Sequence, residues 1–174
     1  LLIQWGVFGN IPNETPENSK AISRHPKTAA IFKIKTERQL KILIAEDNPI
    51  NQRLIKATIE AFGHQAEVVE NGLLAVAAVI GGDFDLLFMD VRMPEMNGSD
   101  ATRTLRKLPG AKSAIPIIAV TSDATNEHRK EYMEAGMNDC VGKPINRAEM
   151  LEAINKVMGE EIHVRTEVEG SGQK

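Results

Sequence analysis

The feature that most limits the fold of this chain is a short apolar run at residues 84–90, which ends in the carboxylate of Asp90. The run is short for a helix and is typical of a strand buried on both faces, as found in parallel sheets. A turn-rich stretch, residues 91–98, follows it directly. Because ligands in open α/β sheets bind at the carboxyl ends of the strands, we expect Asp90 to lie where chemistry takes place.

Three other predicted strands also end in polar residues of complementary type. A single polar residue after a strand usually serves only as a cap or a turn. Four such strand ends together predict one edge of a sheet that carries three acids, a hydroxyl group and a lysine. The additional residues are Glu46 and Asp47 after residues 41–45, Thr121 after residues 115–120, and Lys143 after residues 139–142.

The segments between the strands carry helical signals. Asn48-Pro49 is a helix cap followed by proline at the first helical position. Strict alternation of strand and helix predicts an α/β fold, a doubly wound five-stranded parallel sheet with right-handed crossovers. A strand order of 2-1-3-4-5 brings the first and third strand ends together. The predicted strands are 41–45, 65–70, 84–90, 115–120 and 139–142, and the predicted helices are 49–62, 72–80, 99–108, 125–135 and 146–158.

The chemistry of this edge points to a hard divalent cation and a phosphoryl group. Three carboxylates in one crevice repel one another unless a cation is present, and oxygen ligands around an open position suit Mg²⁺. An ammonium group and a hydroxyl group nearby suit the remaining oxygens of a phosphoryl group. Asp90 is the expected nucleophile, since a carboxylate that attacks phosphorus gives an acyl phosphate.

These residues resemble the receiver domains of two-component response regulators, most closely those of hybrid sensor histidine kinases, over residues 41–159. The matching motifs are residues 44–48, residues 89–98, Thr121 and Lys143-Pro144. The resemblance implies the flavodoxin-like receiver fold and phosphorylation of Asp90. It also implies Mg²⁺ bound by Glu46, Asp47, Asp90 and the Arg92 backbone carbonyl, with Thr121 as the switch hydroxyl and a cis peptide before Pro144.

The same resemblance implies a phosphorelay function. A histidine kinase or a histidine phosphotransfer protein is expected to donate the phosphoryl group, and the domain is expected to switch conformation and control a partner through its last two helices. We expect only self-phosphorylation and autodephosphorylation, with no further enzyme activity. None of the four histidines lies in a kinase-like context, so the donor histidine is expected elsewhere.

Cys140 is the clearest departure from the receiver pattern. It stands three residues before Lys143, where the family commonly has Tyr or Phe. We expect a buried, unreactive thiol in preference to a redox sensor, since free cysteines are most often buried hydrophobic residues. Without an aromatic ring at this position, the signal from Thr121 is expected to pass mainly through the loop to Thr125, with no ring to report it. Asn97, where Asp is more common, is expected to have little effect.

Other function classes match less well. A haloacid-dehalogenase-like phosphatase also uses an Asp nucleophile and Mg²⁺, but it requires a second Asp two residues later, where this chain has Arg92. A nucleotide-binding enzyme requires a glycine-rich phosphate loop, whereas the chain's G-x-G lies at residues 170–172. An interaction module that has stopped accepting phosphate would have lost part of the acidic set, which is intact.

Composition limits the remaining choices. The chain has 174 residues and a net charge of −3, with a basic segment at 1–40 and an acidic body, which argues against a nucleic-acid surface. A single cysteine and the absence of a long apolar run predict a cytoplasmic location without a membrane segment in this chain, which also allows for the cytoplasmic part of a membrane-anchored sensor kinase. The start at Leu1 predicts a fragment of a longer protein. We expect a poorly ordered linker at 1–40, with a marginal strand at 31–34, the receiver domain at 41–159 and a tail at 160–174.

Overall fold

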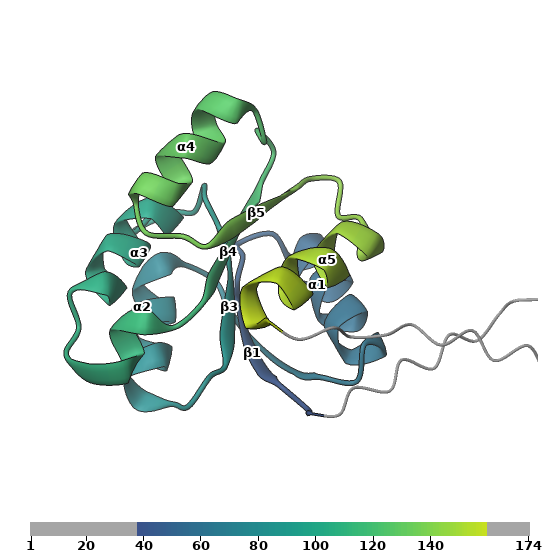
Figure 1. Cartoon of the computed structure of the whole chain (residues 1–174), viewed down its shortest axis with the longest axis horizontal. Helices are drawn as coiled ribbons and strands as arrows, with labels where there is room; N and C mark the ends of the chain where they lie inside the picture. The colour runs from purple at the N-terminus through teal and green to yellow at the C-terminus, as the bar shows by residue number, and fades with distance from the viewer. Residues whose placement is uncertain (1–37, 160–174) are drawn as a thin grey trace, which may run out of the picture.

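The computed structural model describes residues 38–159, which form a five-stranded parallel sheet of order β2-β1-β3-β4-β5. All the strands run in the same direction, so their carboxyl ends meet at one edge (Figure 1). The predicted fold class and strand order are therefore confirmed. The strands are β1 (Lys41–Ala45), β2 (Gln65–Val69), β3 (Leu86–Asp90), β4 (Ile117–Thr121) and β5 (Asp139–Gly142).

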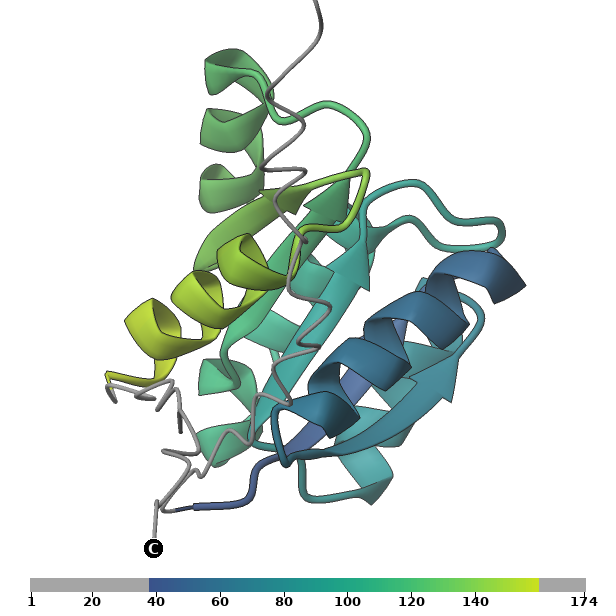
Figure 2. The ribbon, with the colours of Figure 1, turned by 90° about the vertical axis from the view of Figure 1, so that its right-hand side faces the viewer.

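Helices cover both faces of the sheet. Figure 2 shows α1 (Pro49–Ala61) and α5 (Arg147–Met158) in front of one face. Figure 1 shows the other face, which is covered by α2 (Gly72–Gly81), α3 (Gly98–Arg106) and α4 (Asn126–Glu134). Each layer has its own hydrophobic core. This is the three-layer arrangement that strict βα alternation predicts.

Strand β3 lies in the centre of the sheet and all five of its residues are buried. Successive side chains point to opposite faces of a strand. Leu87 and Met89 accordingly pack in the core beneath α2 and α3, whereas Leu86 and Phe88 pack in the core beneath α1 and α5. The apolar run therefore supplies both cores, and it ends at the sheet edge with Asp90.

Asparagine side chains begin four of the five helices. Asn48 accepts hydrogen bonds from the first N–H groups of α1, and Asn71 accepts one from Leu74. Asn97 and Asn146 do the same for α3 and α5. Such caps satisfy backbone N–H groups that have no partner within the helix. Each cap sets the residue at which a helix begins, and therefore the length of the loop that joins the preceding strand to that helix. In this way the caps position the residues at the carboxyl ends of the strands.

Strands β3 and β4 begin two residues later than predicted, at Leu86 and Ile117, and α3 ends at Arg106, two residues earlier than predicted. A 3₁₀ helix, η1 (Gly110–Ala114), was not predicted; within it, Ser113 Oγ donates a hydrogen bond of 2.8 Å to the Gly110 carbonyl. The domain also begins before Lys41, because Leu40 is buried and the Arg38 guanidinium contacts the carboxylate of Asp85.

Within residues 38–159, no helix is long and apolar enough to cross a membrane. The predicted strand at 31–34 and the tail at 160–174 lie outside the described residues.

Candidate functional site

Asp90 is the last residue of β3, and its side chain is almost completely buried. Its Oδ2 atom lies 2.7 Å from Lys143 Nζ, and its Oδ1 atom accepts a hydrogen bond of 3.1 Å from the Arg92 N–H. Backbone hydrogen bonds from Val91 N to Val120 O and from Gly98 N to Val91 O hold the chain directly after Asp90. The carboxylate therefore has a fixed position between a cation and a backbone donor.

Glu46 and Asp47 follow β1, the neighbour of β3. Glu46 is fully buried, and its Oε1 atom accepts a hydrogen bond of 2.9 Å from the side-chain amide of Asn51. Gln52 donates to the Glu46 carbonyl at 2.7 Å, whereas Asp47 is exposed. The first turn of α1 thus orients the buried acid. Sequence reasoning did not identify these two amides, although they lie just after the Asn48 cap.

Lys143 follows β5 and reaches across the sheet edge to both buried acids. Its Nζ atom lies 2.8 Å from Glu46 Oε2 and 2.7 Å from Asp90 Oδ2. A hydrogen bond of 2.7 Å from the Lys143 N–H to the Thr121 carbonyl joins the ends of β5 and β4. The peptide between Lys143 and Pro144 is cis, which confirms the expectation from the receiver resemblance.

The ligand oxygens of Glu46, Asp47 and Asp90 all lie within 4.8 Å of one another. The structure therefore brings together the acids that the sequence placed at separate strand ends. Three carboxylates beside one ammonium group leave an excess of negative charge that a divalent cation would neutralise. Two of the acids are buried and the third is exposed, so a metal at this point would keep an open side.

Burial also changes the proton affinity of the site. Loss of hydration raises the pKa of Asp90 above its ordinary value of 3.8, and the nearby Glu46 carboxylate adds to the increase, although Lys143 and the Arg92 N–H oppose it. Burial lowers the pKa of Lys143, but its hydrogen bonds to Asp90 and Glu46 outweigh that effect, so its pKa is raised. Lys143 therefore stays protonated at neutral pH beside the two buried carboxylates.

Thr121 ends β4, as predicted, and its hydroxyl contacts a residue that the sequence reasoning missed. Tyr132 in α4 is buried, and its Oη atom lies 3.0 Å from Thr121 Oγ1. An aromatic ring thus does contact Thr121, but it comes from α4 and not from the β5 position of Cys140. The tyrosine lies eleven residues beyond the threonine, so only the placement of α4 against the sheet reveals the contact.

Cys140 lies in β5 opposite Ala119 of β4, and it is buried in the core beneath α2 and α3. Burial raises the pKa of its thiol above the ordinary value of 9.0. A reactive cysteine requires exposure and a lowered pKa. The expected burial is therefore confirmed, and the raised pKa agrees with the prediction of an unreactive thiol.

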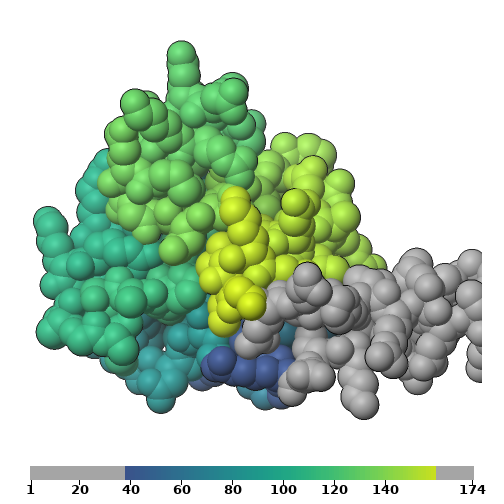
Figure 3. Space-filling model, viewed as in Figure 1, coloured from purple at the N-terminus to yellow at the C-terminus, as the bar shows by residue number. Residues whose placement is uncertain are grey.

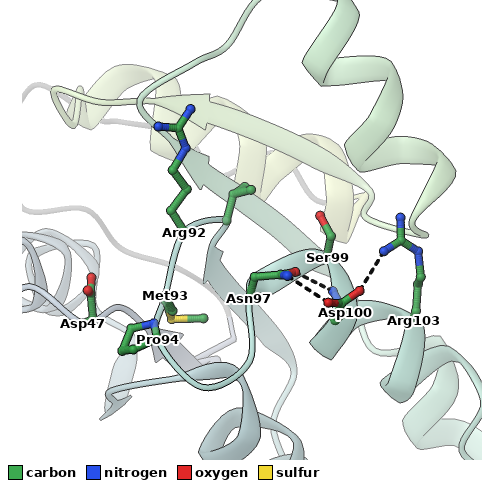
Figure 4. A pocket seen from close by; sticks show the side chains of 9 residues that line it. Asp47, Arg92, Met93, Pro94, Asn97, Ser99, Asp100 and Arg103 are labelled. Atoms are coloured by element: carbon green, nitrogen blue, oxygen red, sulfur yellow. Dashed lines mark hydrogen bonds and ion pairs between the residues drawn. The ribbon is translucent and has the colours of Figure 1, made fainter.

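A cleft lies beside the acidic residues, above the loop that follows β3. Figure 4 shows Asp47 and Arg92 at one end of the cleft, and Asp100 with Arg103 at the other. Asn97 and Asp100 are joined by hydrogen bonds at the start of α3, and Arg103 forms an ion pair with Asp100 at 2.9 Å. The side chain of Arg92 extends away from Asp47, so the acid remains accessible from the cleft (Figure 4).

Comparison with known proteins agrees with this geometry. Residues 42–155 match the model of the response regulator receiver domain. Sensor protein GacS of Pseudomonas syringae pv. syringae is 34% identical over 126 residues, which are 71% of this chain and 14% of that protein. Two-component response regulator 24 of Arabidopsis thaliana is 38% identical over 122 residues, which are 70% of this chain and 86% of that protein. The chain thus spans a small part of the sensor kinase and most of the plant regulator.

A solved structure shares both the fold and the sequence pattern. The receiver domain of a sensor histidine kinase from Pseudomonas aeruginosa PAO1, which has a magnesium ion coordinated in the active site cleft, is 35% identical. It superposes with a TM-score of 0.65, over 71% of this chain and 100% of that one. Chemotaxis protein CheY4 of Vibrio cholerae, at 24% identity and a TM-score of 0.63, shows the fold alone. This chain belongs to the family of response regulator receiver domains.

Proposed function

We propose that Asp90 accepts a phosphoryl group from a phosphohistidine and that the resulting change of charge switches the domain between two conformations. The observation that carries this proposal is the position of the Asp90 carboxylate. It is buried at a strand end, bonded to Lys143 on one side and close to Glu46 and Asp47 on the other. Receiver domains are signalling domains of two-component phosphorelay systems.

Mg²⁺ is the cofactor that the acidic residues suit best. The related Pseudomonas aeruginosa receiver domain holds magnesium in its cleft, and all the ligands available here are hard oxygen atoms. Glu46, Asp47, Asp90 and the Arg92 backbone carbonyl would hold the ion. When bound, Mg²⁺ neutralises charge on the phosphoryl oxygens.

The chain's own residues position the reacting groups. A carboxylate oxygen of Asp90 attacks phosphorus, so an O–P bond forms while the N–P bond of phosphohistidine breaks. The departing ring nitrogen keeps the electron pair of that bond, and the ring, protonated on its other nitrogen, leaves as neutral imidazole. Lys143 provides an ammonium group for a phosphoryl oxygen, and Thr121 provides a hydroxyl donor. The chain itself catalyses no reaction beyond gaining and losing this group.

The partners follow from the same role. The phosphohistidine belongs to a histidine kinase or to a histidine phosphotransfer protein, and the output is a protein that contacts α4 and α5. The unit that performs this role is residues 38–159, flanked by a linker and a tail. The domain works in the cytoplasm, and its parent protein is either a response regulator or a hybrid histidine kinase, including one anchored in the membrane.

The proposal is tested with a small-molecule phosphodonor. The full chain, incubated with Mg²⁺ and radiolabelled acetyl phosphate, should gain one phosphoryl group, and removal of Mg²⁺ by a chelator should prevent this. Asp90→Asn should abolish labelling, while Asp83→Asn, which changes an exposed acid outside the site, should leave it intact. Labelling of the Asp90→Asn variant at the wild-type rate would refute the assignment.

A further inference from the structure

The buried side of α4 contacts the end of β4 through a tyrosine hydroxyl. Tyr132 is 5% exposed and packs in the core beneath α2 and α3. Its Oη atom lies 3.0 Å from Thr121 Oγ1 and donates to the Asp123 carbonyl at 3.2 Å. The phenol thus touches both the residue proposed to contact the phosphoryl group and the loop that follows it.

The hydrogen bonds around Thr121 form a closed set. Thr121 Oγ1 accepts a hydrogen bond of 3.0 Å from the Asp123 N–H and lies 3.3 Å from the Asp123 carbonyl oxygen. The hydroxyl groups of Thr121 and Tyr132 make three contacts: one with each other, and one each with the Asp123 carbonyl oxygen. The two groups have only two hydrogens to donate to these three contacts. The Thr121 hydroxyl is therefore already engaged when Asp90 is unmodified.

The ring of Tyr132 is also tied to the first turn of α4. It stacks on the ring of His128, with the ring centroids 6.4 Å apart and an angle of 19° between the planes. His128 Nδ1 lies 2.9 Å from Thr125 Oγ1 and 3.0 Å from Asp123 Oδ2. A movement of the phenol therefore alters contacts that hold the start of α4, which lies on the face shown in Figure 3 together with α5.

We propose that Tyr132 couples the Thr121 hydroxyl to α4, so that this helix carries the aromatic switch of the domain. The inference rests on the proposed phosphorylation of Asp90. Strands β3 and β4 pair at Asp90 and Val120, so Thr121 follows directly beside the acceptor. A phosphoryl oxygen is a charged acceptor, and hydrogen bonds to charged acceptors are stronger than those between neutral groups. When Thr121 turns to donate to it, Tyr132 loses its hydroxyl partner.

The first test uses the fact that Tyr132 is the only tyrosine of the chain. Tyrosine labelled with ¹³C at Cζ gives one NMR signal, which reports directly on the phenol. Mg²⁺ with beryllium fluoride, a phosphoryl analogue, should shift this signal in the wild type, and the ¹⁹F signals of bound fluoride report occupancy of Asp90. Bound fluoride with an unchanged tyrosine signal would overturn the role of Tyr132. Absence of bound fluoride would instead overturn the proposed function, and with it this inference.

The second test removes only the phenol hydroxyl. Tyr132→Phe keeps the ring but removes the bond that opposes the turning of Thr121. It should therefore tighten beryllium fluoride binding by roughly threefold to tenfold, the range expected for one net hydrogen bond. The gain should disappear in the Thr121→Val background, and Cys140→Ser should have no comparable effect. An unchanged affinity in Tyr132→Phe, or an equal gain in the Thr121→Val background, would contradict the coupling.

Discussion

Asp90 is a carboxyl group whose charged form is poorly hydrated in the folded chain. Burial raises its pKa above 3.8, so the folded state holds the proton more tightly than the unfolded state. The contribution of Asp90 to stability is therefore favourable at low pH, and it is lost as the pH rises above 3.8 through the raised pKa. At neutral pH, the ionised carboxylate destabilises the fold, and a bound cation relieves this cost.

Asp90→Asn should therefore raise the melting temperature by a few degrees at neutral pH when a chelator is present, and the gain should shrink in acid. Mg²⁺ should stabilise the wild type more than the variant, because only the wild type keeps all three carboxylates. Thermal melts with and without Mg²⁺ measure both effects. A lower melting temperature of the variant in chelator would show that the pairing with Lys143 outweighs the cost of burial.

Among the elements, the start of α3 is packed directly against the end of β3. A Cβ atom at Gly98 would press on the carbonyl oxygen of Asp90 and lie 2.8 Å from Met89 Cγ. Gly98→Ala should therefore destabilise the domain by about 1–3 kcal/mol and slow the labelling of Asp90, as overpacking of a dense core does. Gly81→Ala is the matched control, because no atom lies within 4 Å of a Cβ at that position. Equal stabilities in urea unfolding would contradict this packing.

An ion pair network around a buried carboxylate joins α4, β5 and α5. Asp139, which is 5% exposed, lies 2.5 Å from Arg129 Nη2 and 3.0 Å from Lys156 Nζ. Burial raises the pKa of Asp139, but the hydrogen bonds from Lys156, the Cys140 N–H and Arg129 outweigh it and lower the pKa. The network therefore stabilises the fold above pH 3.8, and its contribution is lost as the pH falls through the lowered pKa.

Asp139→Asn should accordingly lower the free energy of unfolding by about 1–3 kcal/mol at neutral pH, because charge-assisted hydrogen bonds are lost and both cations remain exposed to water. The difference from the wild type should decrease in acid. Urea unfolding at several pH values measures it, with Asp83→Asn as the control. A difference that grows on acidification would show that the pKa of Asp139 is not lowered.

For the whole molecule, residues just before Lys41, where the sequence pattern placed the start of the domain, already contact the sheet and its helices. Leu40 is 1% exposed, and the Gln39 side chain donates to the Gly63 carbonyl at 3.2 Å. A fragment of residues 38–159 should unfold at the same urea concentration as the full chain. A fragment of residues 41–159 lacks Leu40 and should be less stable by about 2–5 kcal/mol, the cost of emptying a core position. Equal stability of both fragments would place the boundary at Lys41.

Most of the fold could be predicted because local signals agree with the sheet topology. Apolar runs, asparagine caps and glycine stops mark the strands and helices, and parallel strands bring Asp90, Glu46, Asp47 and Lys143 to one edge. The contact between Thr121 and Tyr132 could not be predicted, because it depends on how α4 turns against the sheet. The Asp139 network likewise requires three elements to meet, and no local pattern specifies such a meeting.

The most direct test of the central claim is to locate the phosphoryl group chemically. Borohydride reduces an acyl phosphate to an alcohol, so a phosphorylated aspartate becomes homoserine, which peptide mass spectrometry identifies. After treatment with acetyl phosphate and Mg²⁺, we predict homoserine at position 90 and at no other acidic residue. Homoserine at position 47, or labelled protein without homoserine at position 90, would contradict the account.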